Sequence, residues 1–422
     1  MKIPSWLGEF KTPIQIARQA LLKNKVRTIL SILGVVIGIA AVIIVLSVGQ
    51  GIKGFLIGQL TTFGTNYIEV EIKVPNTAHT STENATGLAL GVQITTLKES
   101  DMNAILKLDN VRNAYAGSMT QQIVSYKGAN KQTFIFATNA SYSDIDPTKI
   151  AEGRYFTDEE DKGLARVAII GPNLKQTLFG DEDAIGKEIK VGRGAYKVIG
   201  VMDKRGAQSF FDFDSMMYLP INTVQKLIIG VDYVTFIFVQ VKDNSISDLT
   251  ASDITSLMRE RHHITDPNRD DFAVMTEAEA MNMLDTIVGA ITLLLIAIAG
   301  ISLVVGGIGI MNIMYVSVAE RTFEIGLRKA VGAKSADILR QFLMEAIFVT
   351  FSGGIFGIII GSLVSYLITV ISTYLGFNWQ FVMSPLYLLL ACGVSIMVGL
   401  ISGLYPARTA AKLDPMVALR QE

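Results

Sequence analysis

Cysteine, histidine and charge are all scarce in this chain of 422 residues. The single cysteine, Cys392, excludes an internal disulfide and a cysteine-based metal cluster. Only 18% of the residues are charged, against about 25% in ordinary soluble domains, and half are hydrophobic. The mean hydropathy is +0.41. A net charge of −1 provides no overall positive field for nucleic acid, and the composition disfavours a purely soluble protein.

Sequence motifs of catalysis are also missing. No Gly-x4-Gly-Lys-Ser/Thr motif occurs, so the sequence has no P-loop for ATP, and no Gly-x-Ser-x-Gly elbow occurs. The three histidines are His79, His262 and His263, and we interpret the adjacent pair as a solvated helix end rather than a metal site. The acidic run 158–161 is typical of a solvated helix start. We therefore expect no catalytic residue, no metal and no cofactor.

Three long stretches carry no charge at all. They cover residues 28–52, 286–319 and 346–407. One bilayer crossing needs about 20 apolar residues, so the first two stretches hold one helix each and the third holds two. A polar, aromatic hairpin at 372–385 divides the third. The first stretch is too long for a cleaved signal peptide and lacks a cleavage site, so we interpret it as an anchor. The predicted spans are 28–49, 286–316, 341–371 and 385–404.

Charge predicts the orientation of these spans. Four crossings put residues 1–27, 317–340 and 405–422 on one side and residues 50–285 on the other. On the first side, residues 1–27, 320–345 and 408–422 hold 14 of the 37 Lys and Arg and 7 of the 38 Asp and Glu, whereas the long segment has a net charge of −8. The positive-inside rule makes both termini cytoplasmic. Thr12-Pro13 opens an amphipathic helix that we expect to lie on the lipids of the inner leaflet.

Apolar residues at helical spacing continue beyond the membrane. We expect stalk helices at 50–64 and 277–286, the second opened by the capping box Thr276-x-x-Glu279. The proposed packing residues of the stalk are Ile52, Phe55, Leu56, Leu60 and Leu284. These apolar stripes on the stalk helices need packing partners, which favours a bundle of stalk helices in a homodimer. The alternative is that each stripe packs only on its own external domain.

The external segment mixes strands and helices. The predicted strands are 67–74, 111–126, 131–138, 235–242 and 272–275, and the predicted helices are 97–108 and 246–261. Their order indicates a split ferredoxin-like layer, interrupted by a β-rich subdomain at 141–220 with strands 166–170, 188–191 and 195–201. Residues 75–95 are predicted to be a mobile polar loop. The expected fold class is thus membrane α-helical, with four transmembrane helices, plus an α+β extracytoplasmic domain.

Glycines recur at a spacing of four within the predicted spans. They are Gly34 and Gly38, then Gly353, Gly357 and Gly361, then Gly399 and Gly403. Small residues at this spacing mark packing faces, either within one subunit or between subunits. No charge lies at midspan, which disfavours ion-coupled transport. We expect Glu345, near the inner end of the third span, to snorkel or to cap a helix.

The inner segment at 317–340 combines both charge signs with apolar residues. Glu324 and Arg328 form an i,i+4 pair that supports a short helix. Such a helix is suited to docking into a cleft on a soluble ATPase, whereas the alternative is a plain solvated linker. The proposed ATPase-coupling residues are Glu320, Arg321, Glu324, Ile325, Gly326, Arg328 and Lys329.

This inner segment resembles the cytoplasmic loop of the FtsX-like/MacB-like ABC permease superfamily, which has the form Glu-Arg-x-x-Glu-Ile-Gly-x-Arg-x-Ala-x-Gly-Ala. Residues 320–333 match each fixed position of that form. Residues 337–346 and the tail 405–420 are also similar to the family, as is the first span at 22–38. Residues 152–157 and 178–201 look like the MacB-type periplasmic core domain.

The resemblance implies a homodimeric permease of the inner membrane, served by a separate ATPase and by a membrane-fusion (adaptor) protein. MacB itself carries a fused ATPase. These 422 residues contain no P-loop motif of such an ATPase. The family passes ATP-driven motion along stalks to the external domain, which acts on peptides, antibiotics or similar amphiphiles. Alternatives are a lipoprotein-releasing permease of the Lol type and an FtsX-like regulator of cell-wall hydrolases. The large external segment argues against the regulator.

Overall fold

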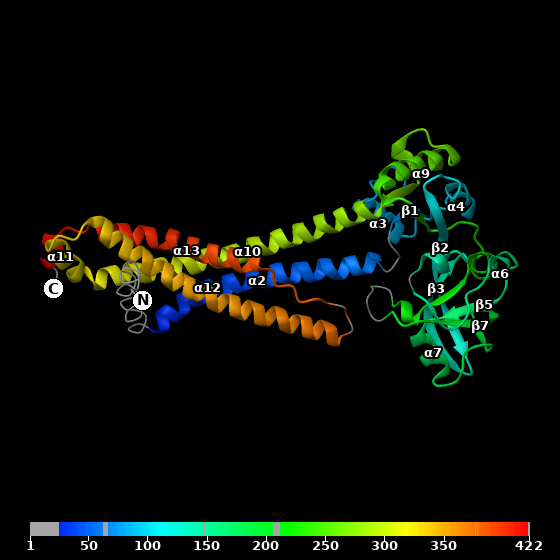
Figure 1. The fold of residues 1–422 in the computed structure, drawn as a ribbon, viewed down its shortest axis with the longest axis horizontal. Coiled ribbons are helices and arrows are strands. Elements are labelled where there is room, and N and C mark those ends of the chain that lie inside the picture. Colours follow the sequence, from blue (N-terminus) through cyan, green and yellow to red (C-terminus); the bar gives the residue numbers. More distant parts are fainter. Residues whose placement is uncertain are drawn as a thin grey trace, which may run out of the picture. The chain divides into compact units, whose positions relative to one another are not determined.

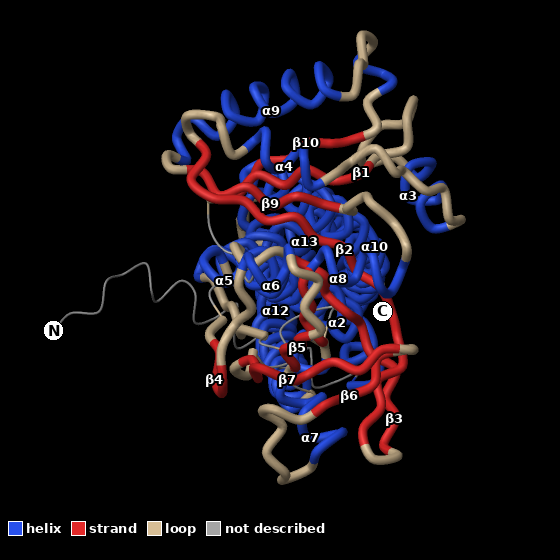
Figure 2. Tube along the Cα trace, turned by 90° about the vertical axis from the view of Figure 1, so that its right-hand side faces the viewer, coloured by secondary structure: helices blue, strands red, loops and turns tan. Residues whose placement is uncertain are grey.

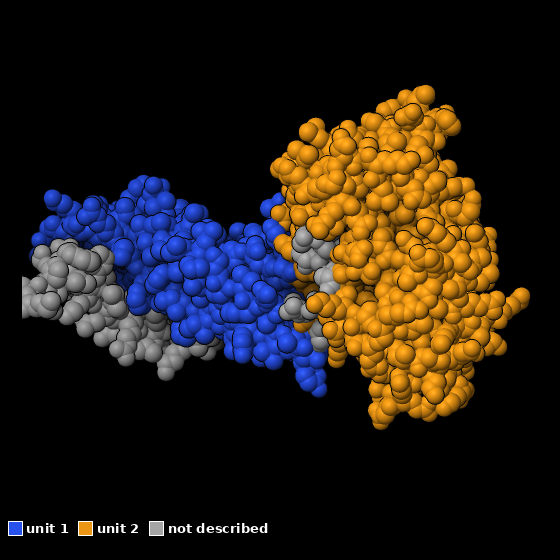
Figure 3. Space-filling model, turned by 45° about the vertical axis from the view of Figure 1, so that its right-hand side comes forward, with its two compact units in different colours: residues 1–54, 286–375, 379–422 blue, residues 55–285, 376–378 orange. Residues whose placement is uncertain are grey.

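A computed structural model describes residues 25–61, 66–146, 148–205, 212–375, 377 and 379–420. The chain divides into two compact units (Figure 3). The membrane unit comprises Met1–Gly54, Thr286–Leu375 and Trp379–Glu422, and the outer unit comprises Phe55–Asp285 and Gly376–Asn378. The expected amphipathic helix before the first span lies almost wholly outside the described residues.

Four helices are long and apolar enough to cross a membrane (Figure 1). They are α2 (Lys25–Thr61), α10 (Glu277–Glu320), α12 (Ser335–Tyr374) and α13 (Pro385–Lys412). At 1.5 Å per residue, the 44 residues of α10 extend for about 66 Å, roughly twice the hydrocarbon thickness. The predicted capping box opens α10, because the Glu279 amide donates to the Thr276 hydroxyl at 3.2 Å and the Thr276 amide to Glu279 at 2.9 Å. Two short helices, α11 (Thr322–Ala330) and α14 (Pro415–Arg420), complete this part of the chain.

The glycine motifs bring these helices into backbone contact inside one subunit. A Cβ atom built on Gly34 would lie 2.7 Å from the Cα of Gly306, where α2 crosses α10. A Cβ on Gly357 would lie 2.8 Å from the carbonyl oxygen of Val36, where α12 crosses α2. Gly399 and Gly403 of α13 face α12 in the same way. Of the two possibilities for these glycines, the structure shows packing within the subunit.

The outer unit is built on one ten-stranded sheet. Its strands run in the order β10-β1-β9-β2-β3-β8-β5-β7-β4, and β6 pairs with β2 and β7. The strands are β1 (Tyr67–Ile72), β2 (Val111–Tyr126), β3 (Ala129–Thr138), β4 (Ile150–Gly153), β5 (Val167–Ile170), β6 (Glu188–Val191), β7 (Gly194–Met202), β8 (Met217–Pro220), β9 (Phe236–Val241) and β10 (Phe272–Thr276). The antiparallel order β10-β1-β9-β2 confirms the ferredoxin-like layer. The long β2 and β3 extend the same sheet into the predicted subdomain.

The two faces of this sheet are covered differently in its ferredoxin-like part. Helices α4 (Glu99–Ile105) and α9 (Ser247–Arg261) pack on one face of the ferredoxin-like part, as Figure 2 shows for α9 beside β10. An aromatic cluster that includes Tyr115, Tyr142 and Tyr218 fills the other face. The remaining helices are α3 (Thr82–Ala89), α5 (Tyr142–Ile145), α6 (Asp158–Lys162), α7 (Pro172–Phe179), α8 (Ile221–Val224), the π-turn η2 (Gln225–Ile229) and the 3-10 turns η1 (Phe213–Ser215), η3 (Asn244–Ile246) and η4 (Pro267–Arg269).

The prediction that residues 75–95 form a polar loop is wrong for Thr82–Ala89, which form the helix α3. Ser81 caps the helix α3 by accepting a hydrogen bond from the Asn84 amide at 3.0 Å. The Asn84 side chain is buried, accepts from the Val74 amide at 2.8 Å and donates to the His79 carbonyl at 2.9 Å. One polar side chain therefore ties the segment to the end of β1.

Candidate functional site

Helix α11 occupies the turn between α10 and α12. The Thr322 hydroxyl donates to the Ala319 carbonyl at 2.9 Å, which joins the start of α11 to the end of α10. After α11, Gly332 adopts a φ of +107°, a conformation that side chains rarely tolerate, and the chain turns into α12. Asp337 then caps α12 by accepting the Lys334 amide at 3.2 Å. The inner segment is therefore a defined helix rather than a plain linker.

Three cations of α11 and its cap are tied to neighbouring helices. Arg321 contacts Glu345 of α12 at 3.2 Å, and the side chain of Glu345 is only 6% exposed. Arg328 donates to the Gln341 side-chain oxygen at 2.5 Å. The Lys329 ammonium donates to the carbonyls of Ala411 at 2.9 Å and Leu413 at 2.6 Å, at the C-terminal end of α13. Arg321, Arg328 and Lys329 therefore position α11, and Glu345 serves as a partner for Arg321.

Two other predicted coupling residues are buried within the subunit. Ile325 is 3% exposed and belongs to the core of the membrane unit. Gly326 is buried where α11 crosses α14, and a Cβ on it would lie 2.6 Å from the Cβ of Ala418. A partner protein therefore cannot reach either side chain without displacing the helix.

The outward face of α11 is apolar. Phe323, Leu327 and Val331 are 56%, 49% and 83% exposed, at positions i, i+4 and i+8. Glu320 is exposed beside them, and Glu324 pairs with Arg328 at 2.6 Å. Sequence reasoning singled out neither Phe323 nor Val331, although their spacing with Leu327 was visible. This face can bind an apolar groove on a partner, and we call it the α11 stripe.

The predicted stalk residues are half-buried where their side chains are described. These are Ile52, Phe55, Leu56 and Leu284, whereas the side chain of Leu60 lies outside the described residues. The rings of Phe55 and Phe377 meet edge to face, with centroids 5.8 Å apart. Phe377 belongs to the polar hairpin between α12 and α13, so this hairpin supplies part of the packing for Phe55. Pairing of stalks between subunits stays a prediction.

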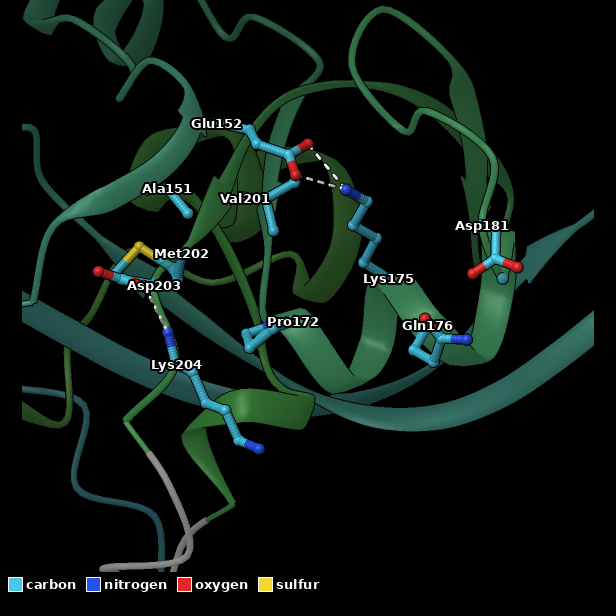
Figure 4. Close-up of a pocket in the computed structure, with 11 residues that line it drawn as sticks. Ala151, Glu152, Pro172, Lys175, Gln176, Asp181, Val201, Met202, Asp203 and Lys204 are labelled. Atoms are coloured by element: carbon cyan, nitrogen blue, oxygen red, sulfur yellow. Dashed lines mark hydrogen bonds and ion pairs between the residues drawn. The ribbon is translucent and has the colours of Figure 1, made fainter.

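The outer unit has an open polar groove of about 420 Å³ beside the edge strand β4 (Figure 4). Lys175 reaches across it to Glu152 at 2.6 Å, and Lys204 lies at the opposite end. Val201, Met202 and Pro172 give it an apolar floor. The groove is therefore lined by both charged and apolar side chains.

His262 is part of a buried ion cluster, so the prediction that it is a solvated helix end is wrong. Its Nδ1 lies 2.8 Å from Asp271 and its Nε2 3.5 Å from Asp101, and its side chain is 6% exposed. Burial lowers the pKa of His262, but the hydrogen bonds to Asp101 and Asp271 outweigh burial and raise the pKa to about 9. Arg261 binds Asp101 at 2.7 Å on the same side. The cluster joins α9, α4 and the start of β10.

Two family models match this sequence. The MacB-like periplasmic core domain matches residues 28–257, and the FtsX-like permease C-terminal domain matches residues 296–415. The first match lies on the outer unit with the first span, and the second on the helices α10 to α13.

The chain is also similar to curated proteins. It is 36% identical to the macrolide export ATP-binding/permease protein MacB of Wolinella succinogenes, over 99% of this chain and 62% of that protein. It is 33% identical to the pyoverdine export ATP-binding/permease protein PvdT of Pseudomonas syringae pv. tomato, over 99% of this chain and 60% of that protein. The chain thus spans 60–62% of the length of these relatives. Among solved structures, the periplasmic region of MacB from Actinobacillus actinomycetemcomitans aligns with a TM-score of 0.45 and 20% identity, over 54% of this chain and 95% of that chain.

Proposed function

Because this chain belongs to the MacB-like/FtsX-like family of ABC transporter permeases, we propose that it is the permease subunit of an ATP-driven export system. The four apolar helices and the MacB-like domain make it a membrane protein with an extracytoplasmic domain. In this proposal a separate ATPase subunit docks on the α11 stripe. Its motion passes through α10 and α2 to the extracytoplasmic domain, which moves the substrate.

The proposed substrates are peptides, antibiotics or similar amphiphiles. Two relatives are named for the export of macrolides and of pyoverdine, which supports this class. The spans carry no charge at midspan, so the proposal routes no polar substrate through the membrane helices. The chain itself is proposed to be non-catalytic, with ATP hydrolysed by its partner.

The orientation in the membrane and the partners of the chain are proposed on separate grounds. The excess of Lys and Arg on the short segments favours cytoplasmic termini in the inner membrane of a bacterium. The apolar stalk stripes favour a homodimer, and the family resemblance favours a membrane-fusion partner outside. The proposed boundaries are unchanged, with an inner segment at 317–340 and an extracytoplasmic segment at 50–285.

One observation supports the docking proposal above all: the cations Arg321, Arg328 and Lys329 bind neighbouring helices, whereas Phe323, Leu327 and Val331 are left exposed. A solvated linker gains nothing from three exposed apolar side chains, whose burial is worth about 1.5–3 kcal/mol each. The ion pair of Arg321 with Glu345 and the hydrogen bonds of Arg328 and Lys329 hold the helix on α12 and α13. Force applied to the α11 stripe is therefore passed to these helices instead of bending a loop.

The test is ATP turnover by the complex reconstituted in lipid nanodiscs. Phe323→Glu combined with Leu327→Glu is expected to weaken partner binding by about 100-fold or more, because at least about 3 kcal/mol of apolar burial is lost. Ala336→Glu, on the exposed first turn of α12, is the matched control. Wild-type partner binding and turnover in the double variant would refute the docking role of α11.

Two further substitutions separate docking from packing. Glu324→Lys keeps the fold but replaces attraction to Arg328 with repulsion, so it is expected to weaken coupling moderately. Gly326→Trp has no space beside Ala418, so it is expected to displace α14 and disturb this end of the protein. Only the first of these is expected to leave the packing of α11 against α14 intact.

A further inference from the structure

Helix α14 packs directly against the proposed docking helix. Asp414 precedes the helix, and its side chain accepts a hydrogen bond from the Met416 amide at 2.8 Å. The Ala418 amide donates to the Asp414 carbonyl at 2.9 Å. Ala418 is fully buried against Gly326 of α11. Lys329 of α11 also holds the carbonyls of Ala411 and Leu413, which precede α14. The two short helices therefore pack as a pair that Lys329 joins to the end of α13.

Helix α14 leaves its larger apolar side chains unpacked. Met416 is 78% exposed and Val417 is 57% exposed, whereas the small Ala418 fills the contact with α11. The same division occurs on α11, where Gly326 makes the contact and Phe323 and Leu327 face outward. Two adjoining helices that meet through the small residues Gly326 and Ala418 and expose larger apolar side chains form a surface suited to an apolar partner.

The position of α14 argues against lipid as the occupant. The exposed rings of Tyr315 and Tyr405 stack at 6.4 Å on α10 and α13, in the pattern of an aromatic belt at a membrane interface. Helix α13 continues for seven residues beyond Tyr405 to Lys412, a rise of about 10 Å. Helix α14 therefore begins on the aqueous side of that belt.

We propose that α14 is a second docking helix for the ATPase, with Met416 and Val417 extending the α11 stripe. This inference rests on the proposed function, because the occupant is the same ATPase. Helix α11 joins α10 to α12, and α14 follows α13. A partner seated on both short helices therefore holds the inner ends of three membrane helices at once, whereas a partner on α11 alone holds two.

Site-specific photo-cross-linking in native membranes tests the proposal in the full chain. A benzophenone amino acid is placed at Met416, Val417 and Phe323, with Ala336 as the exposed control, and adducts are identified by mass spectrometry. Adducts with a P-loop ATPase are expected at Met416, Val417 and Phe323 and not at Ala336.

The outcomes separate the two proposals. An ATPase adduct at Phe323 without one at Met416 or Val417 overturns the role of α14 and leaves the proposed function standing. ATPase adducts at none of the three positions overturn both. Adducts of Met416 or Val417 with lipid, or with a second copy of this chain, also overturn the role of α14. An ATPase adduct at α14 alone overturns the two-helix surface.

Binding measurements give an independent readout. Met416→Glu combined with Val417→Glu is expected to weaken the affinity of the purified chain for its ATPase by about tenfold or more. Met416→Leu combined with Val417→Ile keeps an apolar surface and is expected to retain wild-type affinity. These side chains face outward, so both variants should elute and melt like the wild type. Unchanged affinity in the glutamate variant overturns the proposal.

Discussion

Different kinds of contact stabilise the interior of each of the two units of this chain. In the membrane unit, helices meet where glycines remove side chains, as at Gly34 with Gly306 and Gly357 with the Val36 carbonyl. In the outer unit, contacts rest on sheet pairing, an aromatic cluster and buried ion pairs such as Arg205 with Asp146. In lipid there is no hydrophobic driving force for helices to associate. Close packing of helix backbones therefore supplies the stabilisation instead. A larger side chain should therefore reduce stability most in the membrane unit. Loss of a buried charge should reduce stability most in the outer unit.

The largest effect is expected from Gly357→Leu. A side chain at this position would meet the Val36 carbonyl oxygen and the Ile39 Cβ, each 2.8 Å from the added Cβ. Because backbone atoms cannot move aside easily, we expect the helix pair to separate at a cost of about 3 kcal/mol or more. The yield of folded chain and its melting temperature in detergent measure the effect.

Gly393→Leu on α13 is the matched control. Gly393 is exposed, and nothing lies within 4 Å of a Cβ built there. We expect wild-type yield and stability from this variant. Equal damage from both substitutions would show that glycine matters here for a reason other than close helix approach.

An intermediate effect is expected from His262→Gln in the outer unit. The pKa of His262 is about 9 in the folded chain and near 6.5 in the unfolded chain. A raised folded pKa stabilises the fold fully below about pH 6.5, and this contribution is lost as the pH rises through 9. At pH 7 the contribution is roughly 2–3 kcal/mol.

Denaturant unfolding of the full chain at pH 6, 7.5 and 9.5 measures this contribution. The difference in stability between wild type and His262→Gln is expected to be largest at pH 6 and to shrink toward pH 9.5. The partner carboxylates, Asp101 and Asp271, have lowered pKa values and stay ionised throughout this range. A difference that does not change with pH would mean that His262 acts by packing alone.

The smallest effect is expected from Lys175→Met. Lys175 pairs with Glu152 at 2.6 Å in the open groove, where their side chains are 22% and 46% exposed. Exposed ion pairs contribute about 0–1 kcal/mol, so the melting temperature should stay within error of the wild type. A loss comparable to that of His262→Gln would contradict the view that burial decides the value of an ion pair here.

Regular elements could be predicted from local patterns. The strands at Val111–Tyr126 and Glu188–Val191 have the predicted bounds, because alternating polar and apolar residues predict a half-buried strand. The helix α3 was missed because its stability comes from the buried Asn84, whose partners His79 and Val74 carry no periodic signal. His262 was misjudged for the same reason, since Asp101 lies 161 residues away in sequence.

The inner segment at 317–340 shows what a family motif does not reveal. The family pattern fixes Ile325, Gly326 and Arg328, which the structure uses to hold α11 in place. The exposed residues Phe323 and Val331 fall at variable positions of that pattern. A motif marks residues that the fold requires, whereas a docking face is recognised only when the partners of each side chain are known.

Cysteine protection directly measures the division of α11 into a buried face and a proposed docking face. In a Cys392→Ser background, maleimide reacts with Phe323→Cys or Ile325→Cys in nanodiscs, with and without the purified ATPase. We expect Phe323→Cys to react rapidly alone and to be protected by about tenfold or more when the ATPase is bound, and Ile325→Cys to react slowly in both states. Equal reactivity of Phe323→Cys with and without bound ATPase would contradict the account.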